Sequence, residues 1–256
     1  SQPRPVRVDP RVVATRVRRS PDGTIPEGLE DGDLVVNLHP VNLADGERLM
    51  FYAAQPTAMN LDLAEQFLRR AVKSRRQILG NLRARPDGSR EPLNDRVMVD
   101  CIQGLQAGVV FAVLAIEAFA NHMIALLPEG STVTVAGENN PRSKSQMLKL
   151  ELDLKLRHAV VLHEEVRSAS GDRPWERYVK LRRLRNELIH LQAAPLPERA
   201  DSPDAYGRLV LGEGDNAVET AVNLIEFMKP GFLSDDTFDQ LAVDRPAQDP
   251  VQENTE

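Results

Sequence analysis

Residues 107–116, AGVVFAVLAI, decide the fold because they are apolar nearly all the way round a helix. They lie inside a helical pattern that begins at Asp95 and continues to Leu127, where Pro128 and Gly130 end it. A helix that is apolar on every side must be covered by other elements. We therefore predict that residues 95–127 form the buried central helix of a helical bundle.

Four further segments have helical patterns. Apolar residues recur at three- and four-residue steps in the first, and Ser143 with Gln146 makes a capping box at the start of the next. Pro174 suits the first turn of another helix, which carries residues 175–190. The predicted helices begin near Thr57, Ser143, Pro174 and Asn216, and they end near Leu79, Val166, Pro195 and Pro230.

Strand patterns are confined to short segments. Residues 34–38 and 48–52 each predict a strand in a β unit of about three strands. Residues 205–212 predict one more strand. Residues 132–141 predict a loop, with a short extended segment at residues 133–135. The predicted fold is mainly α: a bundle of about five helices with a small N-terminal β unit. We divide the chain into a β-rich unit (residues 1–54), a helical bundle (55–232) and an acidic, disordered tail (233–256).

Composition narrows the class of protein. The net charge of −6 argues against a general polyanion binder. The single cysteine, Cys101, excludes an internal disulfide and fits a reducing compartment. Because Cys101 lies on the apolar central helix, we expect it to be an inert core thiol. The apolar run of residues 107–116 is shorter than the roughly 18 residues of a membrane span. These features predict a soluble, cytoplasmic protein with no membrane contact.

The candidate site lies in residues 181–191, LRRLRNELIHL. On a helical wheel the leucines face the core, Arg185 lies at the edge of that stripe, and Asn186 and His190 share a neighbouring face four residues apart. Arginine with histidine, and no cysteine or carboxylate cluster beside them, favours acid–base chemistry on a phosphate ester. The pattern indicates neither a metal site nor a cofactor; His158 and His163, five residues apart, do not share a face as a metal pair would.

This pattern resembles that of the HEPN family, all-helical domains of prokaryotic defence and toxin systems. Arg185, Asn186 and His190 match the family's arginine, polar residue and histidine on a late helix, and the run with Glu117 and Asn121 is similar to one on an earlier helix. The resemblance covers about residues 57–193. It implies a metal-independent endoribonuclease that acts as a toxin or defence effector. It also implies a homodimer with a composite active site, and an antitoxin or other regulatory protein as a possible partner.

The residues themselves suit that chemistry. Because the 2′-hydroxyl of RNA can serve as the nucleophile, the protein need only move protons and stabilise charge. His190 would transfer the proton, Arg185 would clamp the phosphate oxygens, and Asn186 would orient one or the other. Glu117 and Asn121 are predicted to support the site from a buried helix, where each must find a polar partner.

Other interpretations stay open. His190 can complement the dipole at a helix end. Arg185 can form an ion pair with Glu117 or Glu187. The chain as a whole can be a HEPN-like dimerisation or partner-binding module without catalysis.

The first predicted helix is locally basic. It has no acidic residue between Gln66 and Pro86, which predicts an RNA-binding surface in an otherwise acidic protein. The alternative is a solvated face balanced by acidic residues elsewhere. The candidate RNA-binding residues are Arg69, Arg70, Lys73 and Arg76.

Overall fold

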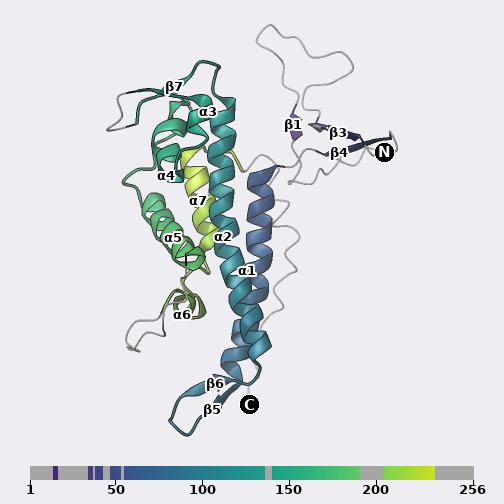
Figure 1. Cartoon of the computed structure of the whole chain (residues 1–256), viewed down its shortest axis with the longest axis vertical. Coiled ribbons are helices and arrows are strands. Elements are labelled where there is room, and N and C mark those ends of the chain that lie inside the picture. Colours follow the sequence, from purple (N-terminus) through teal and green to yellow (C-terminus); the bar gives the residue numbers. More distant parts are fainter. Residues whose placement is uncertain are drawn as a thin grey trace, which may run out of the picture.

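A computed structural model describes residues 14–16, 34–36, 38–42, 47–52, 55–135, 140–190 and 204–233. Its helices form a bundle around one long central helix, and small strands lie near the N-terminus (Figure 1). The mainly α fold with a small β unit is thus confirmed. The predicted acidic tail, from residue 234 onward, lies outside the described residues, as does the predicted end of the fourth helix at Pro195.

Helices α1 (Pro56–Gly80) and α2 (Asp95–Leu126) form an antiparallel pair. Each begins with a side-chain cap, Gln55 accepting from the Ala58 N–H over 2.6 Å and Asn94 from the Val97 N–H over 3.2 Å. A Cβ atom at Gly104 would lie 2.8 Å from the Ala71 Cβ, and one at Gly108 would overlap the Leu68 side chain. The two glycines of α2 therefore allow α1 to pack closely against it.

A β-hairpin that the sequence analysis did not predict joins these helices. Strands β5 (Leu82–Ala84) and β6 (Arg90–Pro92) pair antiparallel and project from the end of the bundle (Figure 1). Gly88 has a φ of 82° in the turn, a conformation that favours glycine. Glu91 accepts hydrogen bonds from both Arg83 and Arg85 across the hairpin.

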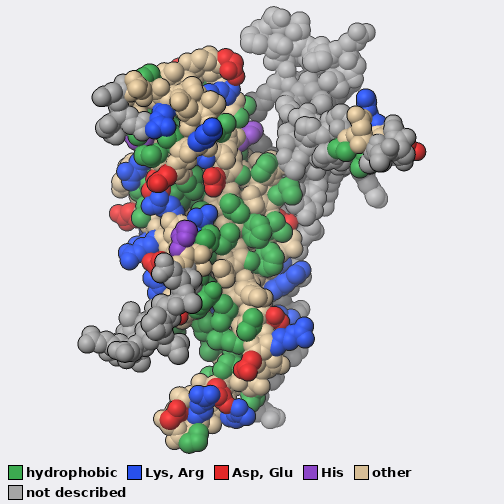
Figure 2. All heavy atoms as spheres, viewed as in Figure 1, with side chains coloured by type: hydrophobic (Ala, Val, Ile, Leu, Met, Phe, Trp, Pro, Cys, Tyr) green, Lys and Arg blue, Asp and Glu red, His purple; other side chains and the backbone are tan. Residues whose placement is uncertain are grey.

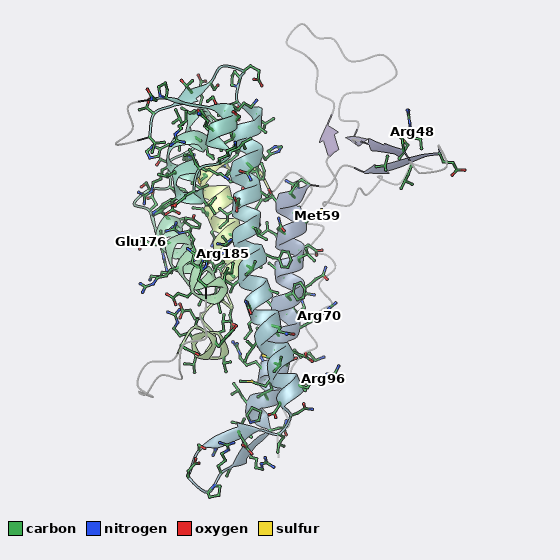
Figure 3. All side chains as sticks on the ribbon, viewed as in Figure 1. Arg48, Met59, Arg70, Arg96, Glu176 and Arg185 are labelled. Carbon is green, nitrogen blue, oxygen red and sulfur yellow. The ribbon has the colours of Figure 1, made fainter. Side chains whose placement is uncertain are left out.

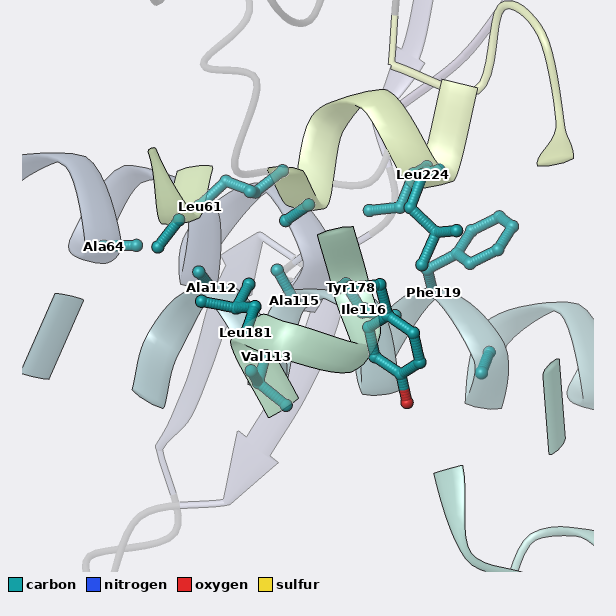
Figure 4. Packing of buried hydrophobic residues seen from close by; sticks show 14 of the residues in the cluster. Leu61, Ala64, Ala112, Val113, Ala115, Ile116, Phe119, Tyr178, Leu181 and Leu224 are labelled. Atoms are coloured by element: carbon teal, nitrogen blue, oxygen red, sulfur yellow. The ribbon is translucent and has the colours of Figure 1, made fainter. Parts of the chain in front are cut away.

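The core lies where α5 (Arg173–Ile189) and α7 (Ala217–Met228) pack on α2. Figure 4 shows α2 side chains, including Ile116 and Phe119, between Tyr178 of α5 and Leu224 of α7. All four of these residues are 0% exposed. The central position of α2 follows from its apolar sequence, as predicted.

The predicted third helix, from Ser143 to Val166, is wrong as a single element. Its capping box is present, but the segment is divided into α3 (Lys144–Met147), α4 (Leu152–Leu154), the π-helix η1 (Lys155–Ala159) and the 3-10 helix η2 (Val160–Leu162). The π-helical turn brings Lys155, Leu156 and Ala159 all into buried positions. Packing of this turn against α2 therefore overrides the regular helical period.

The predicted strand at residues 205–212 is also wrong, because this segment forms helix α6 (Ala205–Val210). The Asp204 carboxylate caps it by accepting from the Gly207 N–H over 2.7 Å. Leu209 is 0% exposed, so one face of α6 joins the core.

The described strands form four separate antiparallel pairs. Near the N-terminus, β1 (Ala14–Arg16) pairs with β2 (Leu34–Val36), and β3 (Leu38–Asn42) pairs with β4 (Arg48–Tyr52). The predicted strand at residues 34–38 is thus divided between β2 and β3. In the loop after α2, β7 (Thr132–Val133) pairs with β8 (Arg142–Ser143).

Among the described helices, α2 alone is long and apolar enough to cross a membrane, by length and composition. Half of its most apolar 18-residue window is buried inside the bundle.

Candidate functional site

The candidate site lies on helix α5, whose buried face is fixed by apolar spacing. Tyr178, Leu181, Leu184 and Leu188 are buried, as the helical wheel predicts. Arg185 and Asn186 are half-buried beside this stripe, and Ile189 is 45% exposed. Figure 3 shows Arg185 on α5, on the other side of α2 from Arg70 of α1.

Arg185 and Asn186 are in direct contact. The Arg185 Nη1 donates a hydrogen bond to the Asn186 Oδ1 over 2.9 Å. The Arg185 Nε is buried and has no hydrogen-bond partner among the described residues. The contact with Asn186 is thus the only hydrogen bond of this guanidinium group among the described residues.

The neighbouring arginines of α5 are neutralised, whereas Arg185 is not. Arg182 forms an ion pair with Asp153 over 3.0 Å, and Arg183 pairs with Glu187 over 3.0 Å. No carboxylate in the described part of the chain pairs with Arg185. Half-buried cations usually have an anionic partner, so Arg185 is the exception on this helix.

His190 caps the C-terminus of α5. Its backbone N–H donates to the Asn186 carbonyl over 3.0 Å, and its side chain is exposed. Within the described residues, the imidazole has no hydrogen bond to Arg185 or Asn186. The structure thus brings Arg185 and Asn186 together and places His190 one turn further on, facing solvent, where it also suits a helix-end role.

Glu117 and Asn121 have a partner that the sequence analysis missed. The Lys155 Nζ lies 2.9 Å from the Asn121 Oδ1 and 3.2 Å from the Glu117 Oε1. Lys155 is 3% exposed, so its charge is compensated inside the bundle. The alternative interpretation, an ion pair of Arg185 with Glu117, is therefore wrong, and Glu117 pairs with Lys155 of the π-helical turn instead.

The other alternative, an ion pair of Arg185 with Glu187, is also wrong. Glu187 binds Arg183 on its own helix and Arg208 of α6. Arg208 also pairs with Glu213 over 3.4 Å.

A second polar cluster, also absent from the sequence analysis, lies next to the Lys155 group. The Tyr178 hydroxyl donates to the Asp153 Oδ1 over 2.6 Å, and Arg182 binds the other oxygen of the same carboxylate. Burial, followed by the hydrogen bond to Asp153, raises the pKa of Tyr178 far above its usual range. The sequence signal was the alternation of charged residues with leucines over residues 149–157, in which Asp153 and Lys155 must find partners if they are buried.

The predicted RNA-binding residues fall into two groups. Arg69 forms an ion pair with Glu65 over 2.8 Å. Arg70, Lys73 and Arg76 are exposed and have no ionic partner among the described residues. The nearby Arg75 belongs to neither group, because it turns inward and donates to Asp215 over 2.8 Å.

The remaining chemically active side chains lie apart from α5. Cys101 is 0% exposed and donates to the Ala71 carbonyl, and burial raises the pKa of its thiol. His163 contacts the Met123 carbonyl over 2.6 Å, and the His122 ring lies against Phe232. In the described ranges, no group of three or more His, Cys, Asp or Glu side chains is arranged to hold a metal ion.

Comparison of the chain with protein-family models, with curated proteins and with solved structures finds no match. The resemblance to the HEPN family therefore rests on the motif of α5 and on the Glu117 to Asn121 run of α2.

Proposed function

We propose that this chain is a metal-independent endoribonuclease of the HEPN type, with Arg185, Asn186 and His190 at its centre. The observation that carries the proposal is the state of Arg185. It is a half-buried arginine whose only hydrogen-bonding partner in the described chain is a neutral amide, while the arginines beside it are paired with carboxylates. A guanidinium group without an acidic partner can bind an anionic ligand. Its planar set of N–H donors can bind two oxygens of a phosphodiester at once.

The three side chains have distinct roles in the proposed reaction. The 2′-hydroxyl of RNA attacks the adjacent phosphorus, the P–O bond to the 5′-oxygen breaks, and a cyclic phosphate forms. His190 removes the proton of the nucleophile or supplies one to the leaving oxygen. Arg185 stabilises the negative charge that accumulates on the phosphate oxygens. Asn186 holds one guanidinium nitrogen and so limits the directions in which Arg185 can point.

A dimer follows from the number of histidines at the centre. The reaction needs a base and an acid, and each chain carries one histidine on α5 near Arg185. Two α5 helices that face each other across a two-fold axis would supply both. The exposure of His190 and of Ile189 at the end of α5 suits such an arrangement. A toxin or defence effector of this kind would need a protein partner that restrains it.

The test is cleavage of end-labelled RNA by the purified chain in EDTA, beside the His190→Ala variant. The matched control is His158→Ala, which removes a histidine from the π-helical turn outside the proposed centre. We expect chelation to leave cleavage unchanged, His190→Ala to lower the rate about 100-fold or more, and His158→Ala to leave it unaltered. Equal cleavage by wild type and His190→Ala would refute the assignment.

A second function is favoured by one observation, an apolar groove of about 400 Å³ between α2 and α6. Leu211 at its edge is 77% exposed, and the lining residues are Met98, Ile102, Tyr206, Gly207, Val210 and Leu211. Exposed apolar surface of this kind is typical of partner-binding proteins. A chain that binds a partner through this groove and leaves RNA intact would be the non-catalytic HEPN-like module.

A further inference from the structure

The exposed side of α1 carries a strip of cations that have no ionic partner among the described residues. Arg70, Lys73 and Arg76, called here the α1 basic strip, follow one another at three-residue steps. Each step advances about 4.5 Å along the helix axis. Figure 2 shows Lys and Arg side chains at the outer edge of the α1–α2 pair, next to exposed hydrophobic side chains.

Other arginines near the strip have acidic partners. Arg69 pairs with Glu65, Arg75 with Asp215, and Arg83 and Arg85 with Glu91. Arg96, on the same side of the molecule in Figure 3, shares its part of α2 with Asp95 and Asp100. The three residues of the strip stand out because none of them has an acidic partner among the described residues.

Such a strip is electrostatically unfavourable unless an anion meets it. Like charges three and four residues apart on a helix repel each other. The acidic residues of α1, Asp62 and Glu65, bind Gln66 and Arg69, and no carboxylate among the described residues pairs with the three cations of the strip. A repeating polyanion would bind all three cations at once, as a phosphate backbone does.

We propose that the α1 basic strip binds the phosphate backbone of single-stranded RNA, at a site separate from the centre on α5. This inference rests on the proposed RNA substrate. Helices α1 and α5 flank α2 (Figure 1), so the strip does not contribute to the Arg185 centre of the same chain. It anchors RNA through its backbone, without regard to sequence, while the bond to be cleaved lies elsewhere on the same strand.

The experiment is the salt dependence of binding of end-labelled polyuridine RNA, measured by fluorescence anisotropy in the His190→Ala background. For single strands, each cation that contacts a phosphate contributes about −0.7 to the slope of log K against log salt concentration. The variant Arg70→Gln/Lys73→Gln/Arg76→Gln should therefore have a slope less steep by about 2, and an affinity at low salt lowered about tenfold.

The matched control is Arg83→Gln/Arg85→Gln/Arg90→Gln in the β5–β6 hairpin. It changes the net charge by the same amount, but two of its three arginines are already paired with Glu91. We expect its slope to stay close to that of the parent. Because all six residues are exposed or half-exposed, circular dichroism should show both variants folded.

Three results would overturn the inference: an unchanged slope in the strip variant, an equal change in both variants, or strip-dependent binding of polyglutamate instead of RNA. The last result would assign the strip to an acidic polypeptide. The measurement needs no cleavage, so a failure of the strip and a failure of the proposed ribonuclease centre are seen separately.

Discussion

The Nη1 of Arg185 lies 2.9 Å from the Oδ1 of Asn186, the next residue along helix α5. Successive residues point about 100° apart on a helix, so this contact requires the long arginine side chain to bend toward its neighbour. The amide restricts the guanidinium without neutralising it. Asn186 is thus a positioning residue for Arg185, a role that can be separated from direct binding of substrate.

The variant Asn186→Ala tests this role. If the amide positions Arg185, the variant should lower kcat for RNA cleavage about tenfold with little change in KM, whereas Arg185→Ala should lower kcat about 100-fold or more. Arg185→Lys should recover little, because an ammonium group lacks the planar fork. A kcat unchanged in Asn186→Ala would show that the contact is structural only.

Because Lys155 is buried and Glu117 is partly exposed, we predict that removal of one partner of this ion pair lowers stability more than removal of the other. Glu117→Ala leaves a 3% exposed ammonium group with the Asn121 amide alone, and should lower the free energy of unfolding by about 2 kcal/mol. Lys155→Met should cost less, because the freed Glu117, 37% exposed, can be hydrated. Urea unfolding of both variants measures the difference. A larger loss in Lys155→Met would contradict this account.

From the raised pKa of Tyr178 we predict that the stability of the fold depends on pH in the alkaline range. Its pKa is raised in the folded state, so its contribution to stability is fully present below the unfolded-state pKa of about 10 and is lost as pH rises above that value. The wild-type chain should lose stability above pH 10. Tyr178→Phe, which keeps the ring in the core and removes the hydroxyl, should have a flatter profile (Figure 4). Thermal unfolding at pH 8 and above pH 10 makes the comparison, and parallel profiles would refute it.

The close approach of α1 to α2 at Gly108 predicts coupling between two substitutions. Gly108→Ala should destabilise the fold by about 1 kcal/mol, since overlap with Leu68 outweighs the better helix propensity of alanine. In the double variant Gly108→Ala/Leu68→Ala, the new methyl group fills part of the space that Leu68 leaves. The two losses should then sum to less than their separate values, by about 0.5 kcal/mol or more. Strict additivity in urea unfolding would show that the two sites do not share this space.

The sequence predicts the long helices because their apolar spacing persists over many turns. α1, α2 and α7 begin and end within about two residues of the predicted bounds, which is the usual uncertainty of helix ends. The short elements are different. In residues 143–166 the local pattern suits a continuous helix, but burial of Lys155 against Glu117 and Asn121 divides the segment. In α6 the cap from Asp204 and the burial of Leu209 decide for helix over strand.

For the candidate site, the residue spacing alone predicts that Arg185 and Asn186 are neighbours, that His190 follows about one turn later, and that the leucines face the core. These relations depend only on helical geometry. Which half-buried arginine of α5 has no carboxylate partner among the described residues depends on helix packing, because the competing anions and cations come from distant segments. Asp153 binds Arg182, Lys155 occupies Glu117, and Arg208 occupies Glu187. Ion pairs between residues more than 20 positions apart depend on how the helices pack, which no local pattern contains.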